Sequence, residues 1–572
     1  MLEINVSVYS TITKTLFTLL CLCCTFVSSS YFVDSYIQPK WYCFLFLTFV
    51  WGAVSVFKVR YQQNIGLDKL TLSIIIFGAF LLVRNVLGGN YLGMAIIIGW
   101  LVLYFLCQTI TKSQSSFFSI TIILFCFLQS LLGLIQFFGI VASKLRAPIV
   151  GSFDNPAGFA VCIAIGIPFC FEWIIRKNNF RILFFFAALI MAIALTISES
   201  RAGIVSVISI FAIILYFKII SLGKIKKATI FLCLLFLLFV VSAGLFFLKK
   251  DSAIGRLFIW KNTFAMIIDH PYTGSGQGSF HSRYMLYQAE FFKTKPANSY
   301  VLLADSVSHP FNEYLLILAE YGVLGFMLCI SIGFILFYYH RPMDPHVLSI
   351  MLVLIFACFS YPFRYPFVWV VLAYCFARLS HKIPVLIQLK IVFISISKIG
   401  ISAVLAFVLY VTGKDVCFEY KWKCVSDLSP EENAQDILST YKQLHSSWNG
   451  NPLFLYNYAA ELYYLKKYSE SLNILHQCEL FLDDYDVQML IATDYYNLRC
   501  WTKVENHLKL ASDMCPARFR PLFYLFSLYK ETGKKEYAIN LARQIAKKPV
   551  KIKSLEIENI KNEVQLYLRG AN

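Results

Sequence analysis

Two neighbouring stretches are the most informative part of this chain: IGRLFIWKNTFAMIIDHPYTGSGQGSF at residues 254–280 and SHPFNEYLLILAEYGVLGF at residues 308–326. They belong to a polar segment, residues 249–312, that interrupts a chain of long apolar runs. Polar and ionisable side chains beside a membrane are costly unless they are used or paired. This segment therefore decides between a transporter, a scaffold and an enzyme. Its candidate reactive side chains are Arg256, His270, His281, Arg283 and His309.

The apolar runs indicate a polytopic membrane protein. Of the 572 residues, 58% are hydrophobic and 15% are charged, whereas a soluble domain has roughly 25% charged residues. The runs are long enough for about 12–13 membrane spans. We therefore expect an all-α fold, with a transmembrane helical bundle over residues 1–413, its long loop at 249–312, and a soluble helical domain over residues 414–572.

The net charge of +18 is a signal of membrane topology. From residue 414 onward acidic and basic residues nearly balance, so the excess lies in the membrane part. If the N-terminus is cytoplasmic, most lysines and arginines of the short loops are cytoplasmic too, which follows the positive-inside rule. This distribution argues against a nucleic-acid partner. It places the loop 249–312 outside the cytoplasm, and an odd number of spans places the C-terminal domain there as well.

The C-terminal domain has a repeated pattern with a period of about 34 residues. The small or aromatic residue of a first helix recurs at Ala459, Ala492 and Phe526, and a second-helix position recurs at Ser471, Val504 and Ala538. The pattern resembles tetratricopeptide repeats, and the alternative is an irregular helical bundle. Stacked repeats of this kind form a surface that binds peptides or helices, so we expect a recognition module with a possible protein partner.

Two short polar clusters lie at the predicted outer membrane face. In GSFDNPAGFA, residues 151–160, Asn155 can cap a helix that has Pro156 in its first turn. Such a helix end can also bind an anion. In SESRAG, residues 198–203, the Arg201 guanidinium either reaches the lipid headgroups or binds a lipid-borne phosphate.

The long loop supplies the third cluster. Arg256 and Trp260 lie on a predicted amphipathic helix from about Gly255 to Ile268, which ends at Asp269-His270-Pro271. Gly274, Gly276 and Gly278 predict a flexible turn, which is a weak signal for nucleotide binding because a strand does not precede it. His309 either makes local hydrogen bonds or transfers a proton near neutral pH.

Together the clusters supply two arginines for phosphate, a candidate base and a helix end on one side of the membrane. This combination suits displacement of a lipid-linked diphosphate by a hydroxyl nucleophile, because arginines stabilise charge that develops on a leaving group. The loop does not contain a pair of acidic residues at metal-ligand spacing, so neither a metal nor another cofactor is implied.

Four ordered blocks resemble the O-antigen ligase superfamily of polytopic membrane glycosyltransferases. They are GSFDNPAGFA, SESRAG, GRLFIWKNTFAMIIDHPYTGSGQGSF and HPFNEYLLILAEYGVLG. The resemblance implies a GT-C-like helical bundle in the bacterial inner membrane with a periplasmic loop over the active site. It implies metal-independent transfer of a glycan from undecaprenyl diphosphate. It also implies that Arg201 and Arg256 bind the donor diphosphate and that His309 activates the acceptor, with Asn155, Asn312, Gly274 and Gly276 in support.

The resemblance has one departure that bears on the site. The family often has His directly before the Asn that matches Asn312, whereas here Phe311 stands there and the histidine is His309. The resemblance also leaves three acceptors open. A ligase uses lipid A-core, a polymerase uses another lipid-linked repeat, and a protein O-oligosaccharyltransferase uses Ser or Thr. The ligase reaction is the leading prediction because the blocks are ligase-like.

Two other classes of protein are weighed against the enzyme. A glycolipid transporter would place charged or broken-helix sites near the bilayer midplane, whereas the polar clusters here lie in predicted external loops. A membrane scaffold would account for residues 414–572 but would leave the loop residues without a role.

Overall fold

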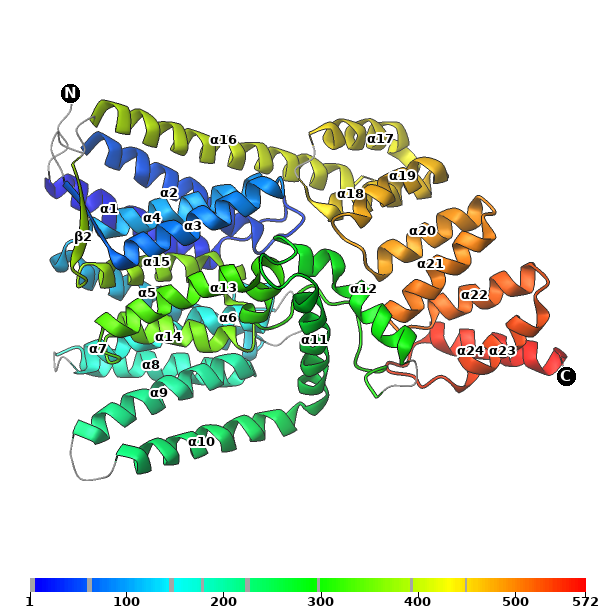
Figure 1. Cartoon of the computed structure of the whole chain (residues 1–572), viewed down its shortest axis with the longest axis horizontal. Coiled ribbons are helices and arrows are strands. Elements are labelled where there is room, and N and C mark those ends of the chain that lie inside the picture. The colour runs from blue at the N-terminus through cyan, green and yellow to red at the C-terminus, as the bar shows by residue number, and fades with distance from the viewer. Residues whose placement is uncertain are drawn as a thin grey trace. The chain divides into compact units, whose positions relative to one another are not determined.

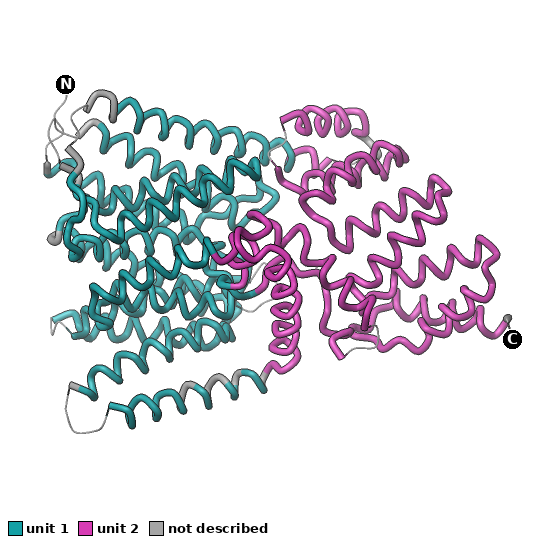
Figure 2. The backbone as a smooth tube through the Cα atoms, viewed as in Figure 1, with its two compact units in different colours: residues 1–248, 311–314, 324–423 teal, residues 249–310, 315–323, 424–572 magenta. Residues whose placement is uncertain are grey.

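The computed structural model describes residues 6–58, 64–142, 149–175, 179–221, 227–295, 299–390, 394–428, 430–447 and 450–571. These residues are mostly helical, and the chain divides into two compact units (Figures 1 and 2). Unit 1 comprises residues 1–248, 311–314 and 324–423. Unit 2 comprises residues 249–310, 315–323 and 424–572. The long loop therefore groups with the C-terminal helices.

Unit 1 is built from long apolar helices. In chain order they are α1 (Val6–Phe26), α2 (Gln38–Lys58), α3 (Lys69–Leu87), α4 (Tyr91–Gln108), α5 (Lys112–Phe137), α6 (Pro156–Ala164), α7 (Ile167–Ile175), α8 (Arg181–Ile197), α9 (Arg201–Ser221), α10 (Lys227–Leu248), α13 (Glu313–Tyr339), α14 (Pro345–Ala357), α15 (Pro366–Ser380) and α16 (Ile394–Ser426). A short 3-10 helix, η1 (Pro362–Arg364), precedes α15. Strands β1 (Asn64–Asp68) and β2 (Val385–Lys390) pair antiparallel.

The helices of unit 1 match the predicted membrane spans. Nine helices among the described residues are long and apolar enough to cross a membrane, and four more apolar helices are shorter. The apolar runs of the sequence fall on these helices, with α6 and α7 sharing one run. The prediction of an all-α polytopic protein is therefore confirmed. Helix α16 continues through residue 413, where the sequence predicts the domain boundary.

Close aromatic packing holds the middle of unit 1 together. Phe17 of α1 lies 4.4 Å from Phe118 of α5, measured between ring centroids, and Phe118 stacks on Tyr374 of α15 at 5.9 Å. All three side chains are buried. Lipid is as apolar as these side chains, so dispersion and interhelical hydrogen bonds, such as Tyr374 with Ser115 at 2.8 Å, drive the association of the helices.

Unit 2 joins the loop helices to the C-terminal helices. They are α11 (Lys250–Asp269), α12 (Ser279–Thr294), α17 (Pro430–Ser446), α18 (Pro452–Tyr464), α19 (Tyr468–Glu479), α20 (Tyr485–Asn497), α21 (Trp501–Met514), α22 (Arg520–Glu531), α23 (Lys535–Lys547) and α24 (Leu555–Ala571). Figure 1 shows the C-terminal helices as successive hairpins. Helix α18 packs on α19, α20 on α21, and α22 on α23.

The predicted repeat positions occupy equivalent places in these hairpins. Ala459, Ala492 and Phe526 are buried in the first helix of each pair. The second-helix positions are buried in α19, α21 and α23, namely Ser471, Val504 and Ala538. Assignment of these hairpins to the tetratricopeptide class stays a prediction.

Candidate active site

The first motif forms a capped helix start in unit 1. Asn155 is the N-cap of α6, and its Oδ1 accepts hydrogen bonds from the N–H groups of Ala157 at 2.8 Å and Gly158 at 3.1 Å. Pro156 is the first helical residue. The capping prediction is confirmed. The cap also occupies the N–H groups through which this helix end would bind an anion.

The side-chain amide nitrogen of Asn155 contacts the tyrosine that precedes α15. Its Nδ2 donates to the hydroxyl of Tyr365 at 2.9 Å, and that hydroxyl donates to Asp154 at 3.2 Å. Gly158 lets the ring approach, because a Cβ there would lie 2.4 Å from a ring carbon of Tyr365. The polar motif between spans is thus fixed against α15 by hydrogen bonds and by close packing.

An arginine outside the three polar clusters of the sequence lies beside this motif. Arg364 forms ion pairs with Asp154 at 3.1 Å and with Asp34 at 3.6 Å. Burial by itself would lower the pKa of Arg364, but Asp154, Tyr365 and Asp34 together raise it above its ordinary value. Two carboxylates therefore neutralise this guanidinium, which makes it a poor candidate for binding a diphosphate.

Lys40 fixes the loop before α6. Its side chain is 0% exposed, and its Nζ donates to the carbonyl oxygens of Val27, Tyr36 and Ser152 at 2.8, 2.8 and 2.9 Å. A buried ammonium is tolerated where its three donors are satisfied. Lys40 thus has a structural role at the predicted outer face.

Arg201 is the first residue of α9 and is half-buried. Two residues later, a Cβ on Gly203 would lie 2.7 Å from Leu195 of α8 and 3.1 Å from Ala160 of α6. The small residue therefore lets the start of α9 pack against the helix that Asn155 caps. Glu199, just before Arg201, has φ +55°, a conformation that is uncommon outside glycine and is often found at functional sites.

In unit 2, the predicted loop helix is confirmed as α11, which ends at Asp269. Arg256 and Trp260 are four residues apart and so share one face of it. The Trp260 Nε1 donates to the carbonyl oxygen of Pro310 at 2.9 Å. Pro310 follows His309, and both Arg256 and His309 are half-buried. The structure thus brings the Arg256 face of α11 to the segment that carries His309.

The glycine turn docks against α13, which is broken at Gly322 (φ +65°). The N–H groups of Ser275 and Gly276 donate to the carbonyl oxygens of Ala319 at 2.9 Å and Glu320 at 3.0 Å. A Cβ on Gly322 would lie 2.3 Å from the carbonyl oxygen of Tyr272, so the close approach requires glycine. Because the break frees helix carbonyls, the turn can bind them in place of the next helical turn.

The third glycine of the turn is held by a side chain. The Gly278 N–H donates to the Glu320 carboxylate at 2.9 Å. Gly274, Gly276 and Gly278 all have positive φ. The N–H groups of Ser275, Gly276 and Gly278 therefore have protein acceptors, and Gly274 and Gly276 support the fold of the loop.

Asn312 caps the start of α13. Its Oδ1 accepts from the Tyr314 N–H at 3.0 Å, and the Tyr314 hydroxyl donates to the Leu354 carbonyl of α14 at 2.9 Å. Phe311, which stands where the family often has histidine, has φ +54° and lies 5.6 Å from the ring of Tyr361. Asn312 and Phe311 belong to unit 1, whereas His309 belongs to unit 2.

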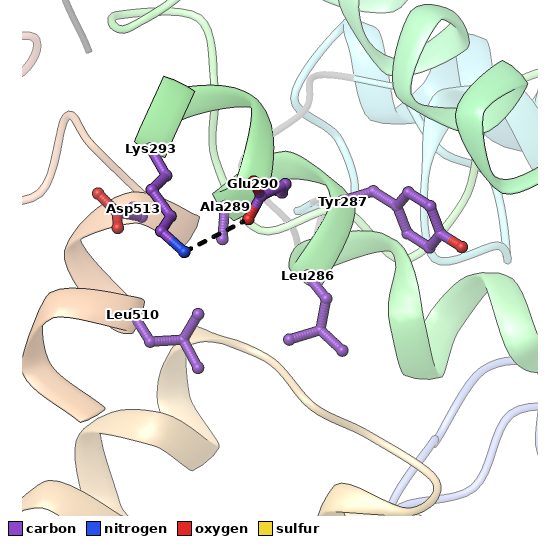
Figure 3. Close-up of a pocket in the computed structure, with 7 residues that line it drawn as sticks. All are labelled: Leu286, Tyr287, Ala289, Glu290, Lys293, Leu510 and Asp513. Atoms are coloured by element: carbon purple, nitrogen blue, oxygen red, sulfur yellow. Dashed lines mark ion pairs between the residues drawn. The ribbon is translucent and has the colours of Figure 1, made fainter. Parts of the chain in front are cut away.

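Unit 2 also contains a pocket of about 370 Å³ between the loop and the C-terminal helices. Figure 3 shows the α12 side chains Leu286, Tyr287, Ala289, Glu290 and Lys293 opposite Leu510 and Asp513 of α21. Lys293 pairs with Glu290 at 3.7 Å. None of the predicted site residues lines it, so the pocket does not belong to the candidate reaction site.

The described residues do not include a group of three or more His, Cys, Asp or Glu side chains arranged to hold a metal ion. Metal independence of the reaction stays a prediction. The sequence reasoning missed Arg364, Lys40 and the Trp260–Pro310 contact. The polar residue inside the aromatic stretch at 361–367 was the available signal for Arg364.

The fold and these residues define a multi-pass membrane protein with an arginine- and histidine-bearing loop. Residues 186–330 match the family model described as O-antigen ligase. The segment includes Arg201, Arg256 and His309, and the match confirms the resemblance to the O-antigen ligase superfamily. It supports a glycosyltransferase of the O-antigen ligase or polymerase type. The search of curated proteins found none that matches.

Proposed function

We propose that this protein is an inner-membrane glycosyltransferase that moves a glycan from undecaprenyl diphosphate to lipid A-core, as an O-antigen ligase does. Arg201 and Arg256 bind the donor diphosphate, and His309 activates the acceptor hydroxyl. The observation that carries the proposal is the hydrogen bond from Trp260 to Pro310. It joins the Arg256 face of α11 to the His309 segment within the stretch that matches the family.

The reaction exchanges one bond at the anomeric carbon for another. The acceptor oxygen bonds to the anomeric carbon of the glycan while the bond from that carbon to the diphosphate oxygen breaks. His309 takes the proton of the acceptor hydroxyl, a step for which imidazole suits neutral pH. Undecaprenyl diphosphate leaves as an anion, and the guanidinium groups stabilise the negative charge that develops on it. In this proposal a metal ion is not required.

Two observations support the side of the membrane on which the reaction takes place. The loop 249–310 and the C-terminal helices belong to one compact unit, which supports placing them on the same side of the membrane. The positive-inside bias supports a position of the loop outside the cytoplasm. We therefore assign both the loop and the C-terminal domain to the periplasm.

A second acceptor class is favoured by the union of loop and C-terminal helices. Of the seven residues that line the pocket between α12 and α21, five belong to the loop helix α12 and two belong to α21. Helical hairpin stacks bind peptides, so a protein acceptor could be held next to the reactive loop. This would make the protein an O-oligosaccharyltransferase.

The test is deletion of the gene, followed by paired gels of lipopolysaccharide and of total glycoprotein. Loss of the long-chain lipopolysaccharide ladder, with lipid-linked glycan accumulating, supports the ligase. A ladder collapsed to one repeat means a polymerase. An intact ladder with glycoproteins shifted to lower mass means a protein O-oligosaccharyltransferase. If lipopolysaccharide and glycoproteins are both unchanged, the proposal is wrong.

A further inference from the structure

A charged contact joins the segment before His309 to the C-terminal helices. The Asp305 carboxylate accepts from Arg518 Nε at 3.2 Å and from a terminal guanidinium nitrogen at 2.9 Å, and Lys551 Nζ lies 3.5 Å from it. Burial by itself would raise the pKa of Asp305, but the Ser306 N–H and the Arg518 guanidinium outweigh it and hold the pKa below its ordinary value. Asp305 is therefore ionised and paired at neutral pH.

Arg518 is itself fixed by the C-terminal helices. Its guanidinium carbon lies 4.1 Å from the ring centroid of Tyr485, and one nitrogen lies 3.7 Å from Asp486 at the start of α20. The Lys548 Nζ donates to the Arg518 carbonyl oxygen at 2.6 Å. A guanidinium that stacks on a ring and forks onto a carboxylate loses little freedom when it binds, so it is a rigid anchor.

A series of buried hydrogen bonds makes a second connection between the loop and the C-terminal helices. Gln288 of α12 is 0% exposed, and its Nε2 donates to the carbonyl oxygens of Met514 at 2.6 Å and Asp305 at 3.1 Å. Its Oε1 accepts from the Tyr284 hydroxyl at 3.1 Å, which in turn accepts from Asn262 of α11 at 3.4 Å. One amide thus links the end of α21, the loop helices and the backbone at Asp305.

The residues from Asp305 to Pro310 form a short segment, called the strap, that is held by contacts at both ends. At its start, Ala304 is buried against Phe258 and Phe292, and Asp305 is held by Arg518 and Gln288. At its end, Pro310 accepts the hydrogen bond of Trp260. His309 lies in this strap, one residue before the second anchor.

We infer that Arg518 and Gln288 are positioning residues through which the C-terminal helices hold the strap and so set the place of His309. The inference rests on the proposed role of His309 in transfer. The C-terminal domain then contributes to the reaction itself, besides any binding of an acceptor. A displacement of about 1 Å in a reacting group can cost roughly 10²-fold in rate, so the anchor is expected to matter although it touches no substrate.

The test compares two arginines that are two positions apart. Arg518→Gln removes the anchor, whereas Arg520→Gln removes an exposed ion pair with Glu556 that does not involve the loop. Asp305→Asn removes the other half of the anchor, and Arg518→Lys keeps the charge but loses the fork. Each variant is made in the full-length protein and purified in detergent. Kinetics are measured with undecaprenyl-diphosphate-linked glycan and the acceptor that the gels identify.

We expect Arg518→Gln and Asp305→Asn each to lower kcat about 10- to 100-fold, with the KM for the donor unchanged. The double variant should lose no more than either single variant, because both remove one interaction. Arg518→Lys should recover part of kcat. Hydrogen–deuterium exchange of residues 304–310 should rise in Arg518→Gln and stay unchanged in Arg520→Gln.

Two results separate the inference from the function on which it rests. If His309→Ala abolishes transfer but Arg518→Gln matches Arg520→Gln in both kcat and exchange, the positioning role is wrong. If His309→Ala keeps full activity while exchange in the strap still rises in Arg518→Gln, the anchor is real but the role of His309 is wrong. Should Arg518→Gln not fold, Asp305→Asn and Arg518→Lys give the same comparison.

Discussion

Trp260 of α11 donates its indole N–H to the carbonyl oxygen of Pro310 at 2.9 Å, and so joins the helix of Arg256 to the residue after His309. The contact spans fifty positions of the chain. It brings together two segments that are separate motifs in the sequence. The position of Arg256 relative to His309 therefore depends on how the loop folds.

Trp260→Phe tests this relationship, because it keeps an aromatic ring and removes the N–H donor. A net hydrogen bond contributes about 1 kcal/mol, so we expect the protein to fold. We expect the transfer rate to fall about tenfold because the strap shifts. The initial rate of glycan transfer by purified protein measures it. The matched control is Trp501→Phe at the start of α21, and equal rates in the two variants would remove Trp260 from the site.

Arg256 is predicted to bind the departing diphosphate through paired N–H donors. Arg256→Ala should lower transfer by about 10²–10³-fold, as is found when one donor to a developing anion is removed. Arg256→Lys should recover little, since an ammonium cannot reproduce the guanidinium fork. Arg283→Ala, an exposed arginine on α12, is the control within the same loop. Similar losses at Arg256 and Arg283 would mean that total loop charge matters rather than a site.

The sequence predicts the parts of this fold that depend on local pattern. The apolar runs identify the spans, Asn155-Pro156 identifies the start of α6, and Asp269-His270-Pro271 identifies the end of α11. Each of these features depends on residues within one or two helical turns. The helical hairpins of the C-terminal domain were predicted for the same reason, from a repeated pattern.

The sequence does not predict contacts between segments that lie far apart along the chain. Asp305 and Arg518 are 213 positions apart. In the sequence, the residues around each of them give no sign that it has a charged partner. Gly274 predicts a turn, but its partner is the break at Gly322 inside a helix that reads as a continuous span. Pairing of this kind depends on the shape of the folded chain, and a single sequence carries no periodic signal for it.

Gly274 and Gly278 offer a matched pair for testing the docked turn. Both have positive φ, but a Cβ on Gly274 would lie 2.3 Å from the backbone of Glu320, whereas a Cβ on Gly278 meets nothing within 4 Å. Gly278→Ala should cost about 1 kcal/mol through φ alone, and Gly274→Ala should cost several times more because the backbone must move. Thermal unfolding of the purified protein compares them. Equal melting temperatures would show that the turn does not pack on α13 this way.

Asp494 of α20 predicts a pH dependence for the C-terminal helices. Its side chain is 0% exposed, and burial raises its pKa to about 7. The unfolded carboxyl has a pKa of about 4. Its contribution to folding stability is therefore complete below pH ~4 and is lost as the pH rises through about 7.

Asp494→Asn removes this titration and should stabilise the protein more at pH 8 than at pH 5, because most of the loss occurs between these pH values. A gain of about 1 kcal/mol corresponds to roughly 2–4 °C in Tm. Thermal unfolding of the full-length protein at both pH values measures the difference between variant and parent, so titration elsewhere in the chain cancels. Glu558→Gln, an exposed carboxylate of α24, is the control and should show no such pH-dependent gain. A gain for Asp494→Asn that is the same at pH 5 and pH 8 would show that the carboxyl does not titrate between them.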